Sequence, residues 1–418
     1  MILILGFLGV LALGSILLML PISHTPGITV KPIDAVFTAA SALFVTGLAS
    51  VNIATHFSGF GQIVIAFLIQ IGGLGFMSVA VVLFVLLGKK VGLRERVVLK
   101  ESLGQNSISG IVRLLKKIIA MTLGIELVGA VLCFVIFIQD FAPLEAVKAS
   151  LFHAVSSFNN CGLDVFDGGM MVYRSSAPML LTTSALVILG GLGFAVICDV
   201  AKKRRFRTLT MHSKIVIVMT VLLLTVGTLL LKLTDGLDWL SAFFQSMTTR
   251  TAGFNSVDNG QLSAGGKFVS MLLMFIGASP GSTGGGIKTT SLFAMLLAAR
   301  SLAKGRERTA FHRKIPAASV LKAFIITLFG AAIVCFCTLV LLLGEPTIAL
   351  SDALYESVSA FATVGLSTGI TPMLHDSSKI VLILTMFLGR LGPLTVACAW
   401  SFNNDSALNY VEEQITVG

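Results

Sequence analysis

Residues 355–366 read YESVSAFATVGL, and the same pattern stands at three earlier places in the chain. The other copies read FTAASALFVTGL at 37–48, FHAVSSFNNCGL at 152–163 and FFQSMTTRTAGF at 243–254. In every copy an aromatic residue precedes a glycine by ten positions, and Leu or Phe follows that glycine. We therefore predict four copies of one structural unit.

A second glycine motif follows each copy, with 24 to 31 residues between the two glycines. It reads GGLGF at 72–76 and 190–194, GGGIK at 284–288 and GRLGP at 389–393. Close helix packing also explains such glycines, because small residues let helices approach in membranes. Together the two motifs predict repeats at 1–88, 111–200, 213–303 and 318–404, followed by a cytoplasmic tail at 405–418.

The composition predicts an all-α polytopic membrane protein. Of the 418 residues, 55% are hydrophobic and 12% are charged, whereas a soluble protein carries about 25% charged residues. A helix rises about 1.5 Å per residue and the hydrocarbon core is about 30 Å thick. Eight stretches are candidates to span it, at 2–20, 60–88, 118–139, 175–198, 215–231, 268–287, 323–344 and 380–404. The first lacks a basic flank and a cleavage site, which favours a retained helix over a signal peptide.

Basic residues concentrate in three loops between these spans. The loops after the second, fourth and sixth spans hold 21 of the 30 Lys and Arg residues. By the positive-inside rule these loops are cytoplasmic, and an even number of spans places both termini inside the plasma membrane. The net charge of +10 therefore reflects orientation and a docking surface for a cytosolic partner, and it does not require a nucleic-acid partner.

The opposite loops carry an excess of acid. They hold seven basic and twelve acidic residues, and this net negative charge raises the local concentration of cations at the outer mouth. The acidic residues are Asp34, Asp140, Glu145, Asp164, Asp167, Asp235, Asp238, Asp258, Glu345, Asp352, Glu356 and Asp376.

The four repeated segments are too short to cross the membrane. As helices of 10 to 12 residues they measure roughly 15 to 18 Å, about half of the core. Non-helical backbone at this depth persists only where it is buried or lines a watery cavity. Glycine permits φ > 0, which lets carbonyl oxygens turn toward a common axis, and helix C-termini favour a cation there. Four such turns predict a carbonyl ring around one pseudo-fourfold pore for a monovalent cation.

At this point the sequence resembles a family. The strings are SPGSTGGGIKT at 279–289, RTAGF at 250–254, GRLGPLT at 389–395 and YVEEQITVG at 410–418, with a filter-like TVGL at 363–366. They resemble the Trk/Ktr/HKT superfamily of potassium transporters, most closely the membrane subunit of bacterial Ktr systems, over essentially the whole chain. The resemblance implies K+ uptake, helix–pore-loop–helix repeats, a homodimer and a cytosolic nucleotide-binding regulatory ring of the RCK type. It implies no organic cofactor in this chain and leaves Na+ dependence open.

The predicted selectivity filter comprises the last three residues of each turn. These are Val45, Thr46, Gly47, Asn160, Cys161, Gly162, Thr251, Ala252, Gly253, Thr363, Val364 and Gly365. Because the four strings differ, we expect K+ to be preferred with imperfect exclusion of Na+ or Rb+. Glycine in all four copies argues against the sodium-preferring branch of the plant relatives.

The sixth apolar stretch is interrupted by glycine and proline, so a continuous helix is not expected there. The resemblance implies that residues 277–289 form an intramembrane gating loop beneath the filter. The predicted gate residues are Gly277, Ser279, Pro280, Gly281, Gly284, Gly285, Gly286, Lys288, Thr289 and Arg390. Lys288 would raise the barrier for K+ near the path, unless its ammonium group reaches the cytoplasmic interface instead.

Three further charged residues interrupt apolar segments. Arg390 resembles the family arginine that faces the gating loop, with a purely structural salt bridge or carbonyl contact as the alternative. Arg250, three residues before Gly253, is expected behind the filter, holding carbonyls or paired with an acid such as Asp258. A hydrogen-bonded structural role is the simplest reading of Glu126.

Other classes of function fit less well. A secondary transporter of another monovalent cation, Na+ or ammonium, would need inverted repeats and a midplane site, whereas these repeats share one topology. The histidines show no metal-ligand spacing and no hydrolase motif is present, which argues against a membrane enzyme. Lys288 comes one residue too late after Gly281 and Gly286 for a phosphate-binding loop.

Overall fold

The computed structural model describes residues 2–75, 78, 81, 92, 109–305 and 307–392. Most of the predicted second span after residue 75, most of the basic loop that follows it and all residues after 392 lie outside the described residues. The tail at 405–418 and the strings that end at 395 and 418 are therefore not described.

The described chain is predominantly helical. Helices of three kinds recur four times in the same order, and we call each such set of three a quarter of the chain. The first kind is long or apolar and begins the quarter: α1 (Ile2–Met19), α7 (Ile111–Phe137), α11 (Met211–Asp235) and α15 (Ala317–Gly344). The second kind is short and largely buried: α2 (Pro32–Leu43), α8 (Pro143–Phe158), α12 (Trp239–Thr248) and α16 (Leu350–Ala362). The third kind follows each short helix: α4 (Gly59–Leu74), α9 (Ala177–Leu192), α13 (Ala264–Phe275) and α17 (Asp376–Leu391).

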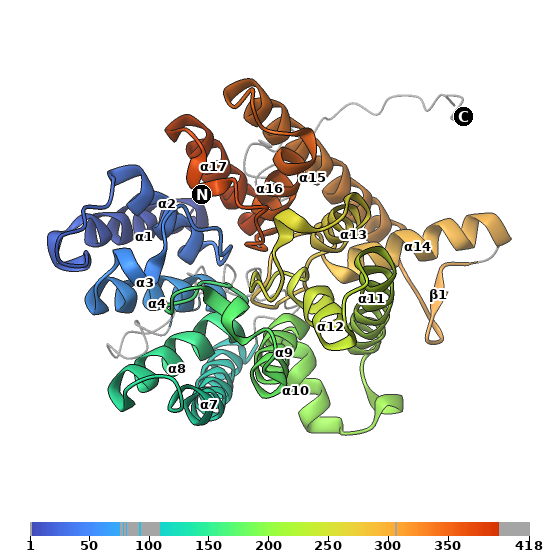
Figure 1. Cartoon of the computed structure of the whole chain (residues 1–418). Coiled ribbons are helices and arrows are strands. Elements are labelled where there is room, and N and C mark those ends of the chain that lie inside the picture. The colour runs from blue at the N-terminus through green and yellow to red at the C-terminus, as the bar shows by residue number, and fades with distance from the viewer. Residues whose placement is uncertain are drawn as a thin grey trace.

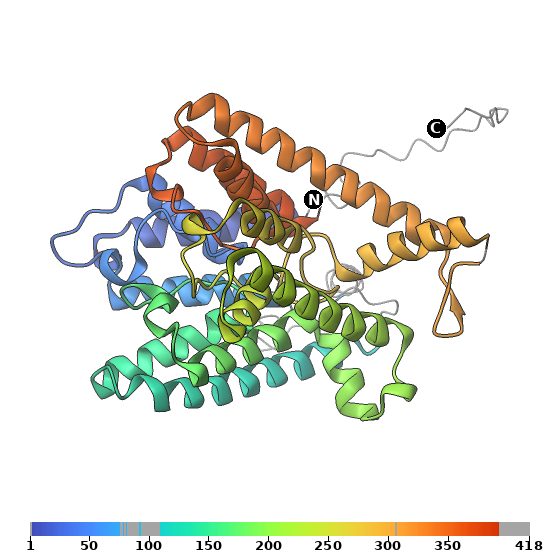
Figure 2. The same cartoon turned by 45° about the vertical axis from the view of Figure 1, so that its right-hand side comes forward.

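Smaller elements complete the described chain. These are α3 (Ile53–His56), α10 (Phe194–Lys203), α14 (Thr289–Lys304), the 3-10 helices at Pro21–Ser23, Gly169–Tyr173, Phe206–Thr208, Asn259–Gln261 and Thr371–Met373, and the antiparallel strands β1 (Thr309–Ala310) and β2 (Arg313–Lys314). Helix α14 and the hairpin project from the periphery in both views (Figures 1 and 2).

The ends of these helices follow from local chemistry. Pro32 and Pro143 start two of the short helices, where a missing N–H costs nothing and the fixed φ suits a first turn. The carboxylate of Asp238 caps α12 by accepting hydrogen bonds from the backbone N–H groups of Leu240 and Ser241, both at 3.1 Å. These residues fix where the short helices begin.

The four quarters close into a circle, which can be followed by colour in Figure 1. Each short helix packs against the long helix before it: α2 on α1, α8 on α7, α12 on α11 and α16 on α15. Each also packs against the third helix of the preceding quarter: α8 on α4, α12 on α9, α16 on α13 and α2 on α17. The last quarter therefore returns to the first.

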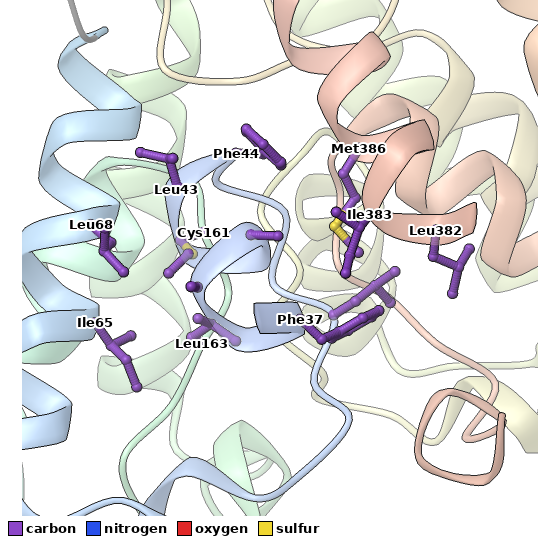
Figure 3. Packing of buried hydrophobic residues seen from close by; sticks show 14 of the residues in the cluster. Phe37, Leu43, Phe44, Ile65, Leu68, Cys161, Leu163, Leu382, Ile383 and Met386 are labelled. Atoms are coloured by element: carbon purple, nitrogen blue, oxygen red, sulfur yellow. The ribbon is translucent and has the colours of Figure 1, made fainter. Parts of the chain in front are cut away.

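Helices α2 and α17 bring the two ends of the described chain together. Phe37 and Phe44 of the first quarter share one buried core cluster with Ile383 and Met386 of α17 (Figure 3). Cys161 from the second quarter lies in the same cluster. Burial of large side chains, worth about 1.5 to 3 kcal/mol each, thus holds the circle closed.

Three described helices are each long and apolar enough to span a membrane, namely α7, α11 and α15. Helices α9 and α10 meet at Gly193 with a bend of 98° and would add a fourth if they form one span. Large apolar side chains on α7 and α15 are exposed, such as Leu127 at 61% and Phe336 at 67%, as expected of helices that face lipid. The count of eight spans stays a prediction.

Candidate ion pathway

Each short helix ends in a buried turn with an unusual backbone. Two residues before each predicted filter glycine, a residue other than glycine has positive φ: Val45 at 56°, Asn160 at 59°, Thr251 at 72° and Thr363 at 50°. The glycines also have positive φ: Gly47 at 95°, Gly162 at 76°, Gly253 at 81° and Gly365 at 93°. A left-handed β-branched residue costs of order 1 to 3 kcal/mol, so the surroundings must enforce it.

Hydrogen bonds to the preceding helix enforce these turns. The backbone N–H of Thr46 donates to the Ser41 carbonyl at 2.8 Å, and Gly47 N–H donates to the Ser41 hydroxyl at 3.0 Å. Val364 and Gly365 repeat both bonds with Ser359, at 2.9 and 3.1 Å. One serine therefore satisfies two backbone donors of the turn.

The other two quarters use the hydroxyl differently. Ser156 donates to the Leu163 carbonyl at 2.9 Å, and Thr248 donates to the Phe254 carbonyl at 2.8 Å. The sequence interpretation missed these four hydroxyl residues. A signal was available, because serine stands four positions after the aromatic residue in three of the four segments.

The four predicted filter glycines meet around one centre in chain order. A methyl group built on Gly47 would collide with the carbonyl oxygen of Cys161, and one on Gly162 would collide with that of Ala252. In the same way, a methyl group on Gly253 would collide with the Val364 oxygen and one on Gly365 with the Thr46 oxygen. The four turns therefore form a closed ring, which we call the glycine ring. Each colliding atom is backbone, so no rotamer change would relieve the contact.

A cavity of about 260 Å³ opens on one side of this ring. All four predicted filter glycines line it, together with Asp164 and Asn255. Asp164 is thus one of the predicted outer acids at this mouth. Glu356 is different, because it is fully buried and accepts a hydrogen bond from Thr371 at 2.9 Å.

An irregular segment between α13 and α14 lies against the same turns. We call residues 276–288 the central loop, because α13 ends at Phe275 and α14 begins at Thr289. A methyl group on Gly284 would meet the Thr251 hydroxyl, and one on Gly285 would meet the Thr363 hydroxyl. The Thr283 hydroxyl lies 3.3 Å from the Asn160 side chain. Three of the four turns are therefore in direct contact with the loop.

The central loop is anchored on the second quarter by backbone bonds. Ser279 N–H donates to the Gly191 carbonyl at 3.1 Å, and Phe194 N–H donates to the Gly281 carbonyl at 3.0 Å. Gly193, at the bend between α9 and α10, has a φ of 92° and no room for a side chain beside the Pro280 carbonyl. The central loop thus packs directly against the bend between α9 and α10.

Two cations hold the loop through its carbonyl oxygens. Arg390 of α17 donates one bond to Thr283 in the loop and another to Gly72 of α4. The Lys288 ammonium donates to the carbonyls of Gly284 at 2.7 Å and Gly285 at 3.3 Å. The structure therefore brings both predicted gate cations together on one loop, and the Lys288 ammonium turns back onto the loop.

The remaining predicted gate residues occupy the loop and its edges. Gly277 and Gly286 lie backbone to backbone, and the Ser279 hydroxyl is 3.1 Å from that of Thr289. Ile276 and Ile287 form a parallel bridge that closes the loop at its base. The loop is thus a folded unit with its own main-chain bonds.

The other second-motif glycines serve packing. A methyl group on Gly72, Gly190 or Gly389 would collide with the carbonyl of Leu43, Phe158 or Phe361. Each of these carbonyls belongs to the end of the short helix in the same quarter. Glycine therefore lets the third helix touch the turn directly, as the packing alternative supposed.

Two ion pairs join neighbouring quarters near the starts of short helices. Asp34 of α2 accepts from Lys379 of α17 at 2.8 Å, and both are 5% exposed. Asp352 of α16 accepts from Lys267 of α13 at 3.0 Å. These charges were expected at the outer mouth, and each pair is neutral, so the net excess of acid there is unchanged.

Glu126 and Arg250 have contrasting surroundings. Glu126 accepts hydrogen bonds from Gln70 at 3.3 Å and Asn159 at 3.0 Å, which agrees with a hydrogen-bonded structural role. Asp258 instead caps its own turn at Gly260 N–H, and no ion pair of Arg250 occurs within the described residues. In the described part of the chain no three His, Cys, Asp or Glu side chains gather as metal ligands.

A predominantly helical protein with long, exposed apolar helices and irregular backbone buried at its centre has the features of the class of α-helical membrane proteins. The sequence profile of a family described as cation transport protein, TrkH, matches residues 5–410. The chain belongs to this family.

Individual proteins show the same relationship. The chain is 40% identical to the Ktr system potassium uptake protein B of Bacillus subtilis, over 100% of this chain and 96% of that protein. It is 38% identical to the potassium/sodium uptake protein NtpJ of Enterococcus hirae, over 99% and 96%. The crystal structure of the potassium transporter TrkH from Vibrio parahaemolyticus matches with a TM-score of 0.74 and 21% identity, over 95% of this chain and 83% of that one. That structural match supports the fold.

Proposed function

We propose that this protein takes up K+ across the bacterial plasma membrane through the ring of turns at Gly47, Gly162, Gly253 and Gly365. The closed order of backbone contacts among the four glycines is the observation that carries the proposal. Potassium binds where several carbonyl dipoles replace its water shell. The curated relatives named for potassium uptake, at 40% and 38% identity, support the same ion.

The direction of entry follows from charge. The cavity beside the ring is lined by Asp164 and belongs to the acid-rich side, and the basic loops mark the other side as cytoplasmic. The proposal therefore includes eight spans in four repeats, with both termini inside. K+ enters from the cavity, passes the ring and reaches the central loop.

The central loop is proposed as the gate. It touches the turns at Asn160, Thr251 and Thr363, and Arg390 and Lys288 place two positive charges on it. Positive charge beside a cation path raises the barrier to passage. Release of the loop by a cytosolic nucleotide-binding ring, acting on a homodimer of this chain, would lower that barrier.

Flux into proteoliposomes tests the ion. Wild-type protein should take up Rb+ and K+ in clear preference to Na+, and Gly47→Ser and Gly253→Ser, whose side chains would collide with the ring backbone, should each lose that preference together with most of the K+ uptake. Unchanged preference in both variants would overturn the assignment of the ring. Uptake of Na+ or ammonium ahead of K+ in the wild type would instead favour a transporter of another monovalent cation. Because one relative is named for potassium/sodium uptake, the external Na+ concentration is the first condition to vary in this assay.

A further inference from the structure

One position near the end of each short helix is filled differently in the four quarters. It stands three residues before the ring glycine, and its occupants are Phe44, Asn159, Arg250 and Ala362. We call these the corner residues. Each corner lies where a short helix meets the third helix of the preceding quarter, so its neighbours come from two quarters.

The first two corner residues have neighbours of matching polarity, although the Asn159 Oδ1 atom has no hydrogen-bond partner among the described residues. Phe44 packs its ring against Phe7 and Phe387, with centroids 6.3 and 5.5 Å apart. Asn159 donates hydrogen bonds to Gln70 at 2.9 Å and to Glu126 at 3.0 Å. An apolar corner thus has apolar neighbours, and a polar corner has polar ones.

At the third corner, the polarity of the residue does not match that of its neighbours. Arg250 is 7% exposed, and its Nη1 atom is buried with no hydrogen-bond partner among the described residues. Ile188 stands two residues before Gly190, as Gln70 stands two before Gly72. On the long helix, Leu224 of α11 faces the third corner, whereas Glu126 of α7 faces the second. A cationic side chain therefore has two apolar neighbours at its corner.

A cavity of about 20 Å³ occupies the space beside Arg250. Its lining includes Ile188, Leu224 and Thr220. The Thr220 hydroxyl is also buried without a hydrogen-bond partner in the described part of the chain. A space of this size holds one water molecule or one monatomic ion.

The charge and the donors decide which occupant fits. The guanidinium group cannot lose its proton in a protein, and an unpaired buried charge is strongly destabilising. The two unpartnered atoms, Arg250 Nη1 and Thr220 Oγ1, can both donate, and none of the described residues that line the cavity is a carboxylate. A neutral water would satisfy a donor but leave the charge uncompensated. We propose that this cavity binds a single small monovalent anion of the chloride class.

The proposed anion site lies between α9, α11 and α12, behind the turn at Thr251, and Asn160 of the second turn and Ala278 of the central loop complete its lining. Its role is to neutralise Arg250 beside a ring that must hold cations. Anion binding alone therefore tests this proposal, and the result does not depend on which cation the ring prefers.

Bromide replaces chloride and has a usable anomalous signal, so crystals of the full chain grown in bromide give the direct test. We expect one anomalous peak within contact distance of the Arg250 guanidinium and the Thr220 hydroxyl, and no peak in Arg250→Gln. An empty or water-filled cavity in wild-type crystals grown in high bromide would overturn the proposal.

Thermal unfolding in detergent supplies a second readout that does not need crystals. Chloride and bromide should raise the unfolding midpoint saturably relative to gluconate, which is too large for the cavity. Thr220→Val removes one hydrogen-bond donor and should weaken anion binding about tenfold. A tenfold loss corresponds to roughly 1.4 kcal/mol of binding free energy, the size of one hydrogen bond. Because this variant keeps the arginine, it tests the site even if Arg250→Gln does not fold.

The matched control is Thr228→Val, two turns further along α11. Its hydroxyl donates to the Leu224 carbonyl at 2.7 Å and is outside the cavity lining. It should leave the anion effect intact. An equal loss in both threonine variants, or an anion effect that persists in Arg250→Gln, would contradict the site.

Discussion

The glycine ring and the central loop are both irregular backbone at the centre of the molecule, yet they are held in different ways. In the ring, each turn abuts the backbone of the next quarter, and no side chain can move aside to relieve a change. The central loop, by contrast, has main-chain bonds to the second quarter, while the side chain of Arg390 ties it to α4 and α17. A ring fixed by main-chain contacts suits selection of an ion, whereas a loop held by a few donors suits release. Selectivity and control therefore occupy adjacent but mechanically distinct parts.

The largest effect is expected when a side chain is forced into the ring. Gly365→Ala would place a methyl group against the Thr46 carbonyl, and K+ uptake should fall at least 100-fold. Gly369→Ala is the matched control, because Gly369 has a similar φ of 96° but nothing within 4 Å. It carries the backbone strain of about 1 to 2 kcal/mol without the collision. Growth on limiting K+ and tracer uptake measure both, and equal losses would show that strain, not the ring, is responsible.

Releasing the loop should have the next largest effect. Arg390→Gln removes the bonds that join Thr283 to Gly72, and a basal K+ flux about tenfold higher is expected in the absence of any regulator. Arg390→Lys keeps the charge but lacks the planar fork that reaches carbonyls on two different elements, so its flux should be intermediate. Flux through reconstituted protein alone is the measurement. Lower flux with altered ion preference would place Arg390 in the ring's support instead.

Lys288 should act in the same direction but less. Its ammonium donates to Gly284 and Gly285 within the loop itself, so its loss leaves the loop attached to α4 and α17. Lys288→Gln is expected to raise basal flux about threefold, with no change in the preference for K+ over Na+. The same flux assay tests this variant. A Lys288→Gln effect larger than that of Arg390→Gln would reverse the proposed order of the two contacts.

The smallest effect concerns the outer helix ends, which belong to neither part. Burial acts to raise the pKa of Glu345, but hydrogen bonds from His375 N–H at 2.6 Å, Ser378 at 2.8 Å and the His375 ring at 2.7 Å outweigh it and lower that pKa. A carboxylate with a lowered pKa stabilises the fold above its unfolded pKa, and this contribution is lost as pH falls through the folded value.

Thermal unfolding between pH 7 and pH 3 measures this contribution. The wild-type midpoint should fall more steeply on acidification than that of Glu345→Gln, while K+ preference at neutral pH stays the same in both. Parallel pH profiles would show that the carboxylate does not link α15 to α17.

The repeated segments predicted much of the centre. The aromatic-to-glycine spacing pointed to Gly47, Gly162, Gly253 and Gly365, and the structure gathers all four. The glycines after residue 276 pointed to a break, and α13 stops at Phe275. These signals are local, because glycine and proline act on their own backbone.

Long-range pairings were not accessible in the same way. Lys379 follows Asp34 by 345 residues, so nothing in either sequence neighbourhood marks their ion pair. Glu356 looked like a mouth acid because its segment is near the outer loops, but the turn after α16 buries it. The bend at Gly193 was also missed, because the apolar stretch at 175–198 was taken as one continuous span.

The most direct test of the central claim is the location of the ion itself. Crystals of the full chain grown with Rb+ in place of K+ should show anomalous peaks on the axis between Gly47, Gly162, Gly253 and Gly365, and these peaks should weaken as K+ is added back. Rb+ peaks elsewhere in the molecule with none between the four glycines would contradict the account.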